Sequence, residues 1–434
     1  MNRELLCRAI QQAETYRYFG KIDKVIGMMI ESIGPECKVG DLCNIYSEGF
    51  KRQIRGEVVG FRGNKTLLMP YEELEGIGAG ALVESTGTTL RIGVSDDLIG
   101  RVIDATGKPI DGGGPIRAEE WCEIQSTCQN PLARPRIREV LEFGVKAIDG
   151  LLTIGKGQRM GIFSGSGVGK STLLGMIARN VKANVNVIAL VGERGREVRE
   201  FLERDLGEEG LARSVLVVAT SDQPPMQRMK CALTATTIAE YFKDKGNDVL
   251  LMMDSLTRFA MAQREIGLAT GEPPVARGYT PSIYSALPKL LERTGNFENG
   301  SITGIYTVLV EGDDVNEPIS DTVRGIIDGH IVLSRKIAMQ NHYPAIDVLG
   351  SVSRLMNDIV GEEQLDVAGK LRNLLSVYTE NADLINIGAY KSGTNKLLDE
   401  AIAKMDGINQ FLRQKVDEKV DYDQSVEMMK AVVA

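Results

Sequence analysis

One glycine-rich stretch of the sequence has the residue types and the spacing that bind phosphate. It reads FSGSGVGKSTLL and runs from Phe163 to Leu174. Glycines in such a loop let backbone N–H groups turn inward towards an anion, a lysine reaches the terminal phosphates, and a hydroxyl binds Mg²⁺. The residues that we expect to contact nucleotide phosphates are Gly165, Ser166, Gly167, Val168, Gly169, Lys170, Ser171 and Thr172.

The flanking residues support this interpretation. The apolar run RMGIF predicts a strand before the loop, and STLLGMIARN predicts a helix after it. The positive N-terminal end of that helix would face the bound anion. Ser164 stands where the pattern G-x-x-x-x-G-K-[ST] has its first glycine. Because a small residue should fit at the start of the loop, we expect the site to tolerate this serine.

Two carboxylates are candidates for the remainder of the site. The apolar run VLLMM ends in Asp254, and a carboxylate at the end of a buried strand can bind Mg²⁺ together with the hydroxyl of Ser171. Glu193 follows the run VNVIALVG and could polarise an attacking water. Without other evidence, however, a glutamate within a run of charged residues more often lies on the solvent-exposed face of a helix.

The segments that must position these residues alternate between two patterns. From about residue 145 to 345, apolar runs such as VNVIALVGE and SVLVVATS alternate with helical segments such as MQRMKCALTATTIAEYFKDKG. This alternation predicts an α/β domain, with a parallel sheet and helices on both of its faces. We expect the strand that precedes Glu193 to lie beside the strand that precedes the loop.

The rest of the chain predicts further domains. Residues 21 to about 91 contain short strands punctuated by glycine, with a hairpin around Gly63 and Asn64, as in a small β-barrel. Residues 3–14 and the region after 356 have the spacing of amphipathic helices. We therefore expect an N-terminal helix (1–20), a β-barrel domain (21–92), a phosphate-loop domain (93–355) and a helical domain (356–434). The apolar face of the N-terminal helix could pack on the chain's own next domain, on a partner protein or on a membrane surface, and the family resemblance described below implies a partner-binding role for it.

Composition excludes some classes of function. The chain has 434 residues, with 51 Lys and Arg against 59 Asp and Glu, and a net charge of −8. This sign opposes non-specific binding of nucleic acid. The six cysteines are sparse and form no C-x-x-C pair, so we expect reduced thiols in the cytoplasm. We also expect neither a signal peptide nor a membrane-spanning helix.

Four stretches, GSGVGKS, GERGREV, LLMMDSLTRFA and PAIDVLGSVS, together resemble the α/β family of ring ATPases. This family includes the rotary ATP synthase subunits and the ATPases of type III protein export. The resemblance covers essentially the whole chain and implies a RecA-like core that hydrolyses ATP with Mg²⁺. It also implies a catalytic role for Glu193, phosphate contacts for Arg194 and Arg258, a finger that reaches a neighbouring subunit for Arg354, and adenine stacking for Tyr343.

Longer stretches, including GKGQRMGIFSGSGVGKSTLLGMIAR and GEPPVARGYTPSIYSALPKLLERTG, look like the type III export ATPases, most closely the flagellum-specific branch. Because one chain holds both Glu193 and Arg354, the resemblance implies a homohexamer in which each copy gives a finger to the next. It further implies five associations: a regulator at the N-terminal helix, a central stalk protein, an export gate, chaperone–substrate complexes at the helical end, and peripheral attachment at the cytoplasmic face of the membrane apparatus.

Several alternatives remain open at this point. An ATPase of a virulence injection system would have the same chemistry, as would a catalytic subunit of a rotary ATP synthase. A ring that moves RNA would need a basic, aromatic barrel, whereas the segment 21–92 is acidic to neutral with few aromatics. A ring subunit that does not hydrolyse ATP is disfavoured by Glu193. The acidic stretch EGDDVNEP (311–318) is expected to be a solvated loop or a subunit contact, and not a second metal site.

Overall fold

The computed structural model describes residues 17–47, 52–125, 130–310 and 317–434. These residues form two compact units, the first made mainly of residues before Ile92 and the second mainly of Ile92–Ala434. The helix predicted at 3–14 and most of the acidic stretch 311–318 lie outside the described residues. No helix in the described part of the chain is long and apolar enough to cross a membrane.

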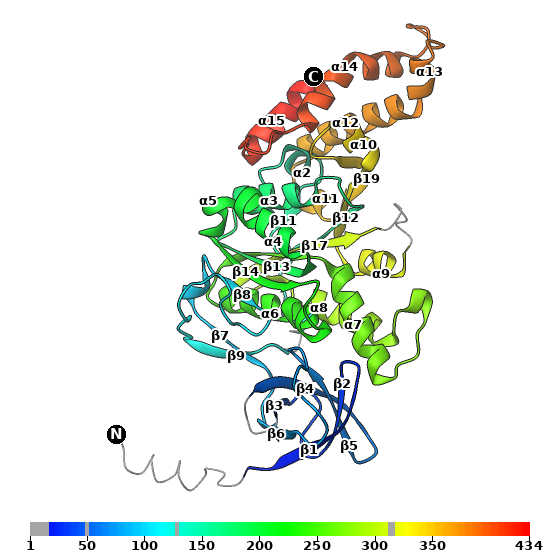
Figure 1. Cartoon of the computed structure of the whole chain (residues 1–434). Coiled ribbons are helices and arrows are strands. Elements are labelled where there is room, and N and C mark those ends of the chain that lie inside the picture. Colours follow the sequence, from blue (N-terminus) through cyan, green and yellow to red (C-terminus); the bar gives the residue numbers. More distant parts are fainter. Residues whose placement is uncertain (1–16, 48–51, 126–129, 311–316) are drawn as a thin grey trace. The chain divides into compact units, whose positions relative to one another are not determined.

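The first unit contains the predicted β-barrel, drawn in blue in Figure 1. It is closed, in the order β1-β2-β5-β4-β3-β6. The predicted hairpin is confirmed, since β4 and β5 are antiparallel with Arg62 opposite Lys65 and Gly63 takes a left-handed φ of 62° in the turn. The barrel strands are β1 (Phe19–Ile26), β2 (Met29–Ile33), β3 (Leu42–Tyr46), β4 (Gln53–Arg62), β5 (Lys65–Pro70) and β6 (Leu82–Ser85).

The second unit is built around a nine-stranded sheet in the order β19-β18-β12-β17-β15-β13-β14-β8, with β16 paired to β17. Its strands are β8 (Val102–Asp104), β12 (Arg159–Ser164), β13 (Val185–Glu193), β14 (Ser214–Thr220), β15 (Asp248–Asp254), β16 (Gly295–Phe297), β17 (Gly300–Leu309), β18 (Gly329–Leu333) and β19 (Ile346–Ser353). Short strand pairs outside this sheet are β7 (Arg91–Val94) with β9 (Glu120–Glu123), and β10 (Val140–Leu141) with β11 (Ile154–Gly155).

The parallel sheet predicted from the apolar runs is confirmed, with two differences. Every residue of β13 is buried, as expected for a strand covered by helices on both faces. However, β13 does not lie beside β12, because β15 and β17 stand between them. In addition, β19 runs antiparallel to β18, so the residue after Ser353 lies at the edge where the parallel strands begin.

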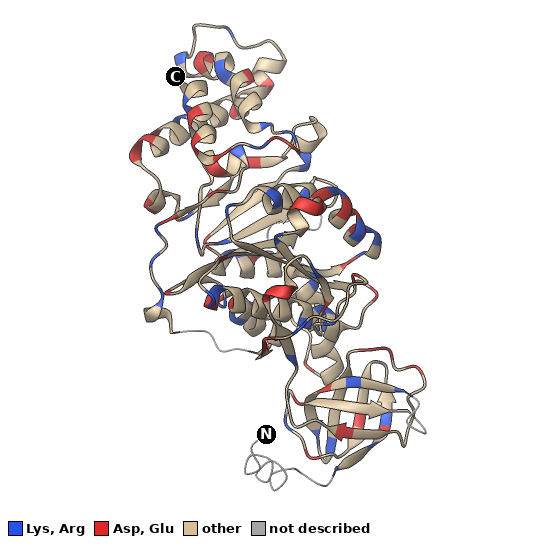
Figure 2. Ribbon diagram, turned by 90° about the vertical axis from the view of Figure 1, so that its left-hand side faces the viewer, with Lys and Arg blue, Asp and Glu red and all other residues tan. Residues whose placement is uncertain are grey.

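Helices cover both faces of this sheet (Figure 1). The α- and π-helices described between Val145 and Glu362 are α2 (Lys146–Leu151), α3 (Lys170–Asn180), α4 (Gly195–Glu200), η4 (Phe201–Leu206), α5 (Gly207–Leu211), α6 (Pro225–Asp244), α7 (Leu256–Thr270), α8 (Pro281–Leu291), α9 (Pro318–Ile326), α10 (Arg335–Met339) and α11 (Met356–Ile359). Basic and acidic residues are interspersed along the described parts of both units (Figure 2).

The C-terminal segment is helical, as predicted, and is drawn in orange to red in Figure 1. Its helices are α12 (Glu362–Glu380), α13 (Ala382–Asn386), α14 (Lys396–Leu412) and α15 (Tyr422–Val433). Phe411 of α14 and Met429 of α15 belong to the same buried apolar cluster as Ile148 and Leu173 of the sheet-containing part. The helical segment and the sheet therefore share one hydrophobic core, and a shift of these helices must be accommodated beside α2.

Candidate active site

The predicted phosphate loop joins β12 to α3, and its shape depends on glycine. Gly167 and Gly169 have φ angles of 77° and 86°, a left-handed conformation that residues with a Cβ rarely adopt. Gly169 immediately precedes α3, so the free N–H groups of the first helical turn face the loop. A Cβ on Gly169 would lie 3.4 Å from the ring of Tyr343. The loop therefore has the geometry of a phosphate cradle, with Tyr343 beside it.

The Lys170 amine lies between two buried carboxylates. It forms an ion pair with Asp254 Oδ1 and lies 3.8 Å from Glu193 Oε1. Both acids are nearly inaccessible, with exposed fractions of 5% for Asp254 and 6% for Glu193. They meet because Asp254 ends β15 opposite Leu190 of β13, and Glu193 ends β13 a short distance further along. The structure thus brings the predicted lysine and the two predicted carboxylates together.

Glu193 is in a different protonation environment from an exposed glutamate. Burial, followed by the negative charge of Asp254, raises its pKa to about 7, while Lys170 and Arg258 oppose the shift. Arg258 Nε lies 3.3 Å from Glu193 Oε1. A carboxyl group with this pKa can gain or lose a proton near neutral pH, which is the property that a general base requires.

Two residues of this cluster were not singled out from the sequence. Thr307 of β17 donates a hydrogen bond of 2.6 Å from its hydroxyl to Asp254 Oδ1 and so orients that carboxylate. Gly192 has a φ of 69°, and a Cβ there would lie 3.0 Å from Arg258 Cδ. Gly192 therefore permits the close approach of Arg258 to Glu193. A polar residue inside the buried run ITGIYTVLV was the available signal for Thr307.

The donor set fits Mg²⁺. The buried Asp254 carboxylate already has a positive partner in Lys170, and Ser171 lies in the first turn of α3. Mg²⁺ in nucleotide sites is commonly held by one or two protein oxygens, with waters and phosphate oxygens completing the shell. No group of three or more His, Cys, Asp or Glu that could hold a metal occurs in the described part of the chain.

Ser164 occupies its unusual position without distorting the loop. It ends β12, pairs with Leu309 in parallel register, and its carbonyl accepts a hydrogen bond of 3.0 Å from the backbone N–H of Val310. The side chain is 1% exposed, and within the described residues its hydroxyl has no hydrogen-bond partner. Together with Gly165, Ser164 lines a cavity of about 180 Å³ beside the loop.

Three predicted residues lie outside the carboxylate cluster. The Arg194 side chain is 63% exposed and pairs with Glu197 at 3.2 Å. Tyr343 is 42% exposed, and its carbonyl accepts a hydrogen bond of 3.0 Å from the Gln414 N–H. Arg354 is exposed and follows β19, at the edge of the sheet opposite the loop. Arg354 therefore cannot act on a nucleotide in the loop of its own chain.

Comparison with family models gives three matches along the chain. Residues 22–87 match the beta-barrel domain of the ATP synthase alpha/beta family, and residues 144–353 match its nucleotide-binding domain. Residues 360–431 match the C-terminal domain of the T3SS EscN ATPase. The three matches follow the barrel, the sheet and the C-terminal helices.

Full-length relatives agree with these matches. A flagellum-specific ATP synthase of Bacillus subtilis is 56% identical over 98% of both chains, and a type 3 secretion system ATPase of Xanthomonas euvesicatoria is 49% identical over 100% of this chain and 97% of its own. The assembled ATPase EscN of enteropathogenic E. coli superposes with a TM-score of 0.91 at 46% identity, covering 96% of this chain and 100% of EscN. The chain therefore belongs to the ATP synthase alpha/beta family and is an ATPase of the type III system group within it.

Proposed function

We propose that this chain forms a homohexameric ring whose Mg²⁺-dependent ATP hydrolysis assists the export of flagellar proteins through a type III export gate. One observation carries the proposal. A single chain has the Lys170, Glu193 and Asp254 cluster at one edge of its sheet and Arg354 at the opposite edge. In a head-to-tail ring, the second edge of each copy faces the first edge of the next.

The residues of the cluster have distinct roles in this mechanism. Lys170 and the loop amides hold the β- and γ-phosphates, and Ser171 with Asp254 would hold Mg²⁺, which supplies positive charge to the phosphates. Glu193 accepts a hydrogen bond from the attacking water and polarises it, because its pKa of about 7 leaves a carboxylate available at neutral pH. Water attacks the γ-phosphorus and gives a proton to Glu193, and the bond to the ADP oxygen breaks, which releases ADP and inorganic phosphate.

Arginines balance the charge that develops during this transfer. Arg258 lies beside Glu193, and Arg194, the exposed residue that precedes α4, would contact the phosphates once nucleotide is bound. Arg354 of the next copy would contact the γ-phosphate, and Tyr343 would stack on adenine. An arginine supplied by a neighbouring subunit accelerates related phosphoryl transfers by about 10³ to 10⁵, so an isolated copy should be slow.

Mixing two inactive variants tests whether sites are shared between copies. Lys170→Ala and Arg354→Ala proteins should each hydrolyse ATP poorly, and a mixture should regain part of the activity, because some interfaces combine an intact loop with an intact arginine. Specific activity of the wild type should also rise with protein concentration. A mixture that stays inactive, with wild-type activity independent of concentration, contradicts the shared site and favours a heteromeric rotary subunit.

The flagellar assignment is supported by flagellum-specific relatives that are 56% and 52% identical to this chain, from Bacillus subtilis and Treponema pallidum. Restoration of swimming in a flagellar ATPase deletion strain, without restored secretion in an injection-system ATPase deletion strain, would support it. The opposite pattern would assign the chain to an injection system.

We propose the same set of partners that the sequence resemblance implies, at the cytoplasmic face of the membrane apparatus. EscN has been solved with its central stalk EscO, which supports a stalk partner here. Deletion of residues 1–18 should abolish binding of a regulator and leave ATP hydrolysis intact. Unchanged affinity for the regulator would contradict the role given to residues 1–20.

A further inference from the structure

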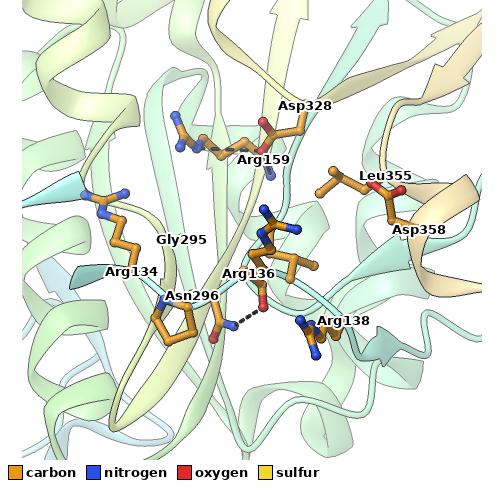
Figure 3. A pocket seen from close by; sticks show the side chains of 12 residues that line it. Arg134, Arg136, Arg138, Arg159, Gly295, Asn296, Asp328, Leu355 and Asp358 are labelled. Carbon is orange, nitrogen blue, oxygen red and sulfur yellow. Dashed lines mark hydrogen bonds and ion pairs between the residues drawn. The ribbon is translucent and has the colours of Figure 1, made fainter. Parts of the chain in front are cut away.

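A cavity of about 580 Å³ opens at the edge of the sheet where the parallel strands begin. Arg159 at the start of β12, Asn296 in β16 and Asp328 just before β18 contribute to its wall. Figure 3 shows four arginines around it, Arg134, Arg136, Arg138 and Arg159. The cavity is thus separated from the phosphate loop by the length of the strands.

The four arginines divide into two pairs with different environments. Arg134 and Arg159 are largely buried and are held by Glu292, with Arg159 Nη1 donating to Glu292 Oε1 at 2.6 Å. Their Nε atoms are buried, and within the described residues neither has a hydrogen-bond partner. Arg136 and Arg138 are exposed, and neither guanidinium forms a hydrogen bond or an ion pair with another described residue.

Two aspartates partly balance these charges. Asp328 accepts a hydrogen bond of 3.0 Å from the Arg159 backbone N–H and lies 3.8 Å from Arg159 Nε. Asp358 lines the opposite side and is exposed. Four guanidinium groups face three carboxylates, those of Asp328, Asp358 and Glu292. The excess positive charge lies with the exposed Arg136 and Arg138, so this part of the cavity is complementary to added carboxylates.

The cavity and Arg354 share one surface. The Arg354 N–H donates to the Asp328 carbonyl at 3.0 Å, and Leu355, the next residue, lines the cavity. If Arg354 reaches the nucleotide of a neighbouring copy, the cavity must face that same copy. The neighbour would present the edge at which its own strands end.

We propose that this arginine cavity is half of the interface between copies and binds carboxylates from the phosphate-loop edge of the next copy. The inference rests on the proposed ring. The next copy can supply such groups, since α4 follows β13 at that edge and its last residue, Glu200, is exposed with no ion pair to a described residue. Arg136 and Arg138 would gain partners on assembly, which couples ring closure to the placement of Arg354.

Charge reversal tests this interface. In the full chain, Arg136→Glu with Arg138→Glu should raise the protein concentration that gives half-maximal specific ATPase activity by at least about tenfold, because two attractive contacts become repulsive. The matched control is Lys391→Glu with Lys396→Glu, which makes the same change in net charge at exposed positions of the helical segment. A shift no larger than that of the control overturns the proposal.

Two further measurements keep the result interpretable. The milder Arg136→Gln with Arg138→Gln variant should shift the same concentration in the same direction by a smaller factor, and both variants should retain the wild-type thermal unfolding temperature when dilute. If the Lys170→Ala and Arg354→Ala proteins rescue each other but reversal has no effect, only the cavity assignment fails. If they do not rescue each other, the ring itself is wrong.

Discussion

The two edges of the central sheet hold their charged groups in different ways. Where the strands end, Lys170, Glu193, Asp254 and Arg258 are paired with one another, and the two acids are buried. Where the strands begin, Arg136, Arg138 and Arg354 are exposed, and no acid of the described residues pairs with their guanidinium groups. The charged groups at the first edge are paired within the chain, whereas these three exposed arginines at the second edge are available to a partner. Substitutions at the first edge should therefore change the chemistry within each site, and those at the second should act between copies.

The largest effect is expected from Arg354→Ala. At a protein concentration that saturates assembly, kcat should fall by about 10³ to 10⁵, because the positive charge supplied to the transition state is lost, while the affinity for ATP changes little. Arg354→Lys is the matched control and should recover only part of the rate, since lysine lacks the planar, two-pronged donor geometry. A near wild-type kcat for the assembled Arg354→Ala variant would contradict the proposal that the second edge contributes to catalysis in a neighbouring copy.

Glu193→Gln should lower kcat by about 10² to 10⁴ without preventing assembly. The pH profile provides a sharper readout. Because burial raises the pKa of Glu193 in the free enzyme to about 7, the active carboxylate forms only as the pH rises through this value, and wild-type kcat/KM should fall below about pH 7. The residual activity of the variant should lack that acidic limb. An identical limb in both proteins would assign the titration to another group.

Thr307→Val should have an intermediate effect. It removes the hydroxyl that orients Asp254 and leaves a side chain of similar shape, so we expect kcat to fall about tenfold. The Mg²⁺ concentration for half-maximal activity should rise at the same time. Thr303→Val is the control, because Thr303 lies on the same strand and bonds to the Gly157 N–H, away from Asp254. A fall in kcat with no change in Mg²⁺ dependence would contradict the orienting role.

The smallest effect is expected from Ser164→Ala. Its buried hydroxyl has no hydrogen-bond partner among the described residues, so its removal leaves no group unpaired and should change the free energy of unfolding by less than about 1 kcal/mol. ATPase activity should stay within about twofold of the wild type. A large loss of activity would show that the serine contributes to the site itself.

Sequence patterns predicted the first edge well because its residues follow locally recognisable strands. The apolar run before Asp254 indicates the end of a strand, and the glycines before Lys170 indicate a turn. Both signals are local and do not depend on the rest of the chain. The prediction that β13 lies beside β12 was wrong, because the order of strands in a sheet depends on connections that local sequence patterns do not encode. Thr307 and Gly192 were missed because their roles depend on contacts with Asp254 and Arg258, from other elements.

The second edge was harder to predict for a related reason. The stretch NPLARPRIREV reads as a turn-rich connector, and nothing in its local composition indicates that Arg134 and Arg138 will lie around a common cavity with Arg159. The cavity forms only because segments far apart in the sequence, around Arg136, Arg159, Asn296 and Asp328, meet at the same edge of the sheet. The role of Arg354 came from family resemblance, whereas its place at the far edge follows from the direction of β19.

The reversed direction of β19 has a consequence for regulation in the cell. If Arg354 acts on the nucleotide of a neighbouring copy, as proposed, a chain that carries its phosphate loop and this arginine at opposite edges completes a site only together with another copy. Newly made or dispersed copies would then consume little ATP, and turnover would begin where local concentration favours ring closure. ATP hydrolysis would then be confined to the place of assembly without an additional inhibitor. The antiparallel orientation of β19 would limit ATP hydrolysis by unassembled copies.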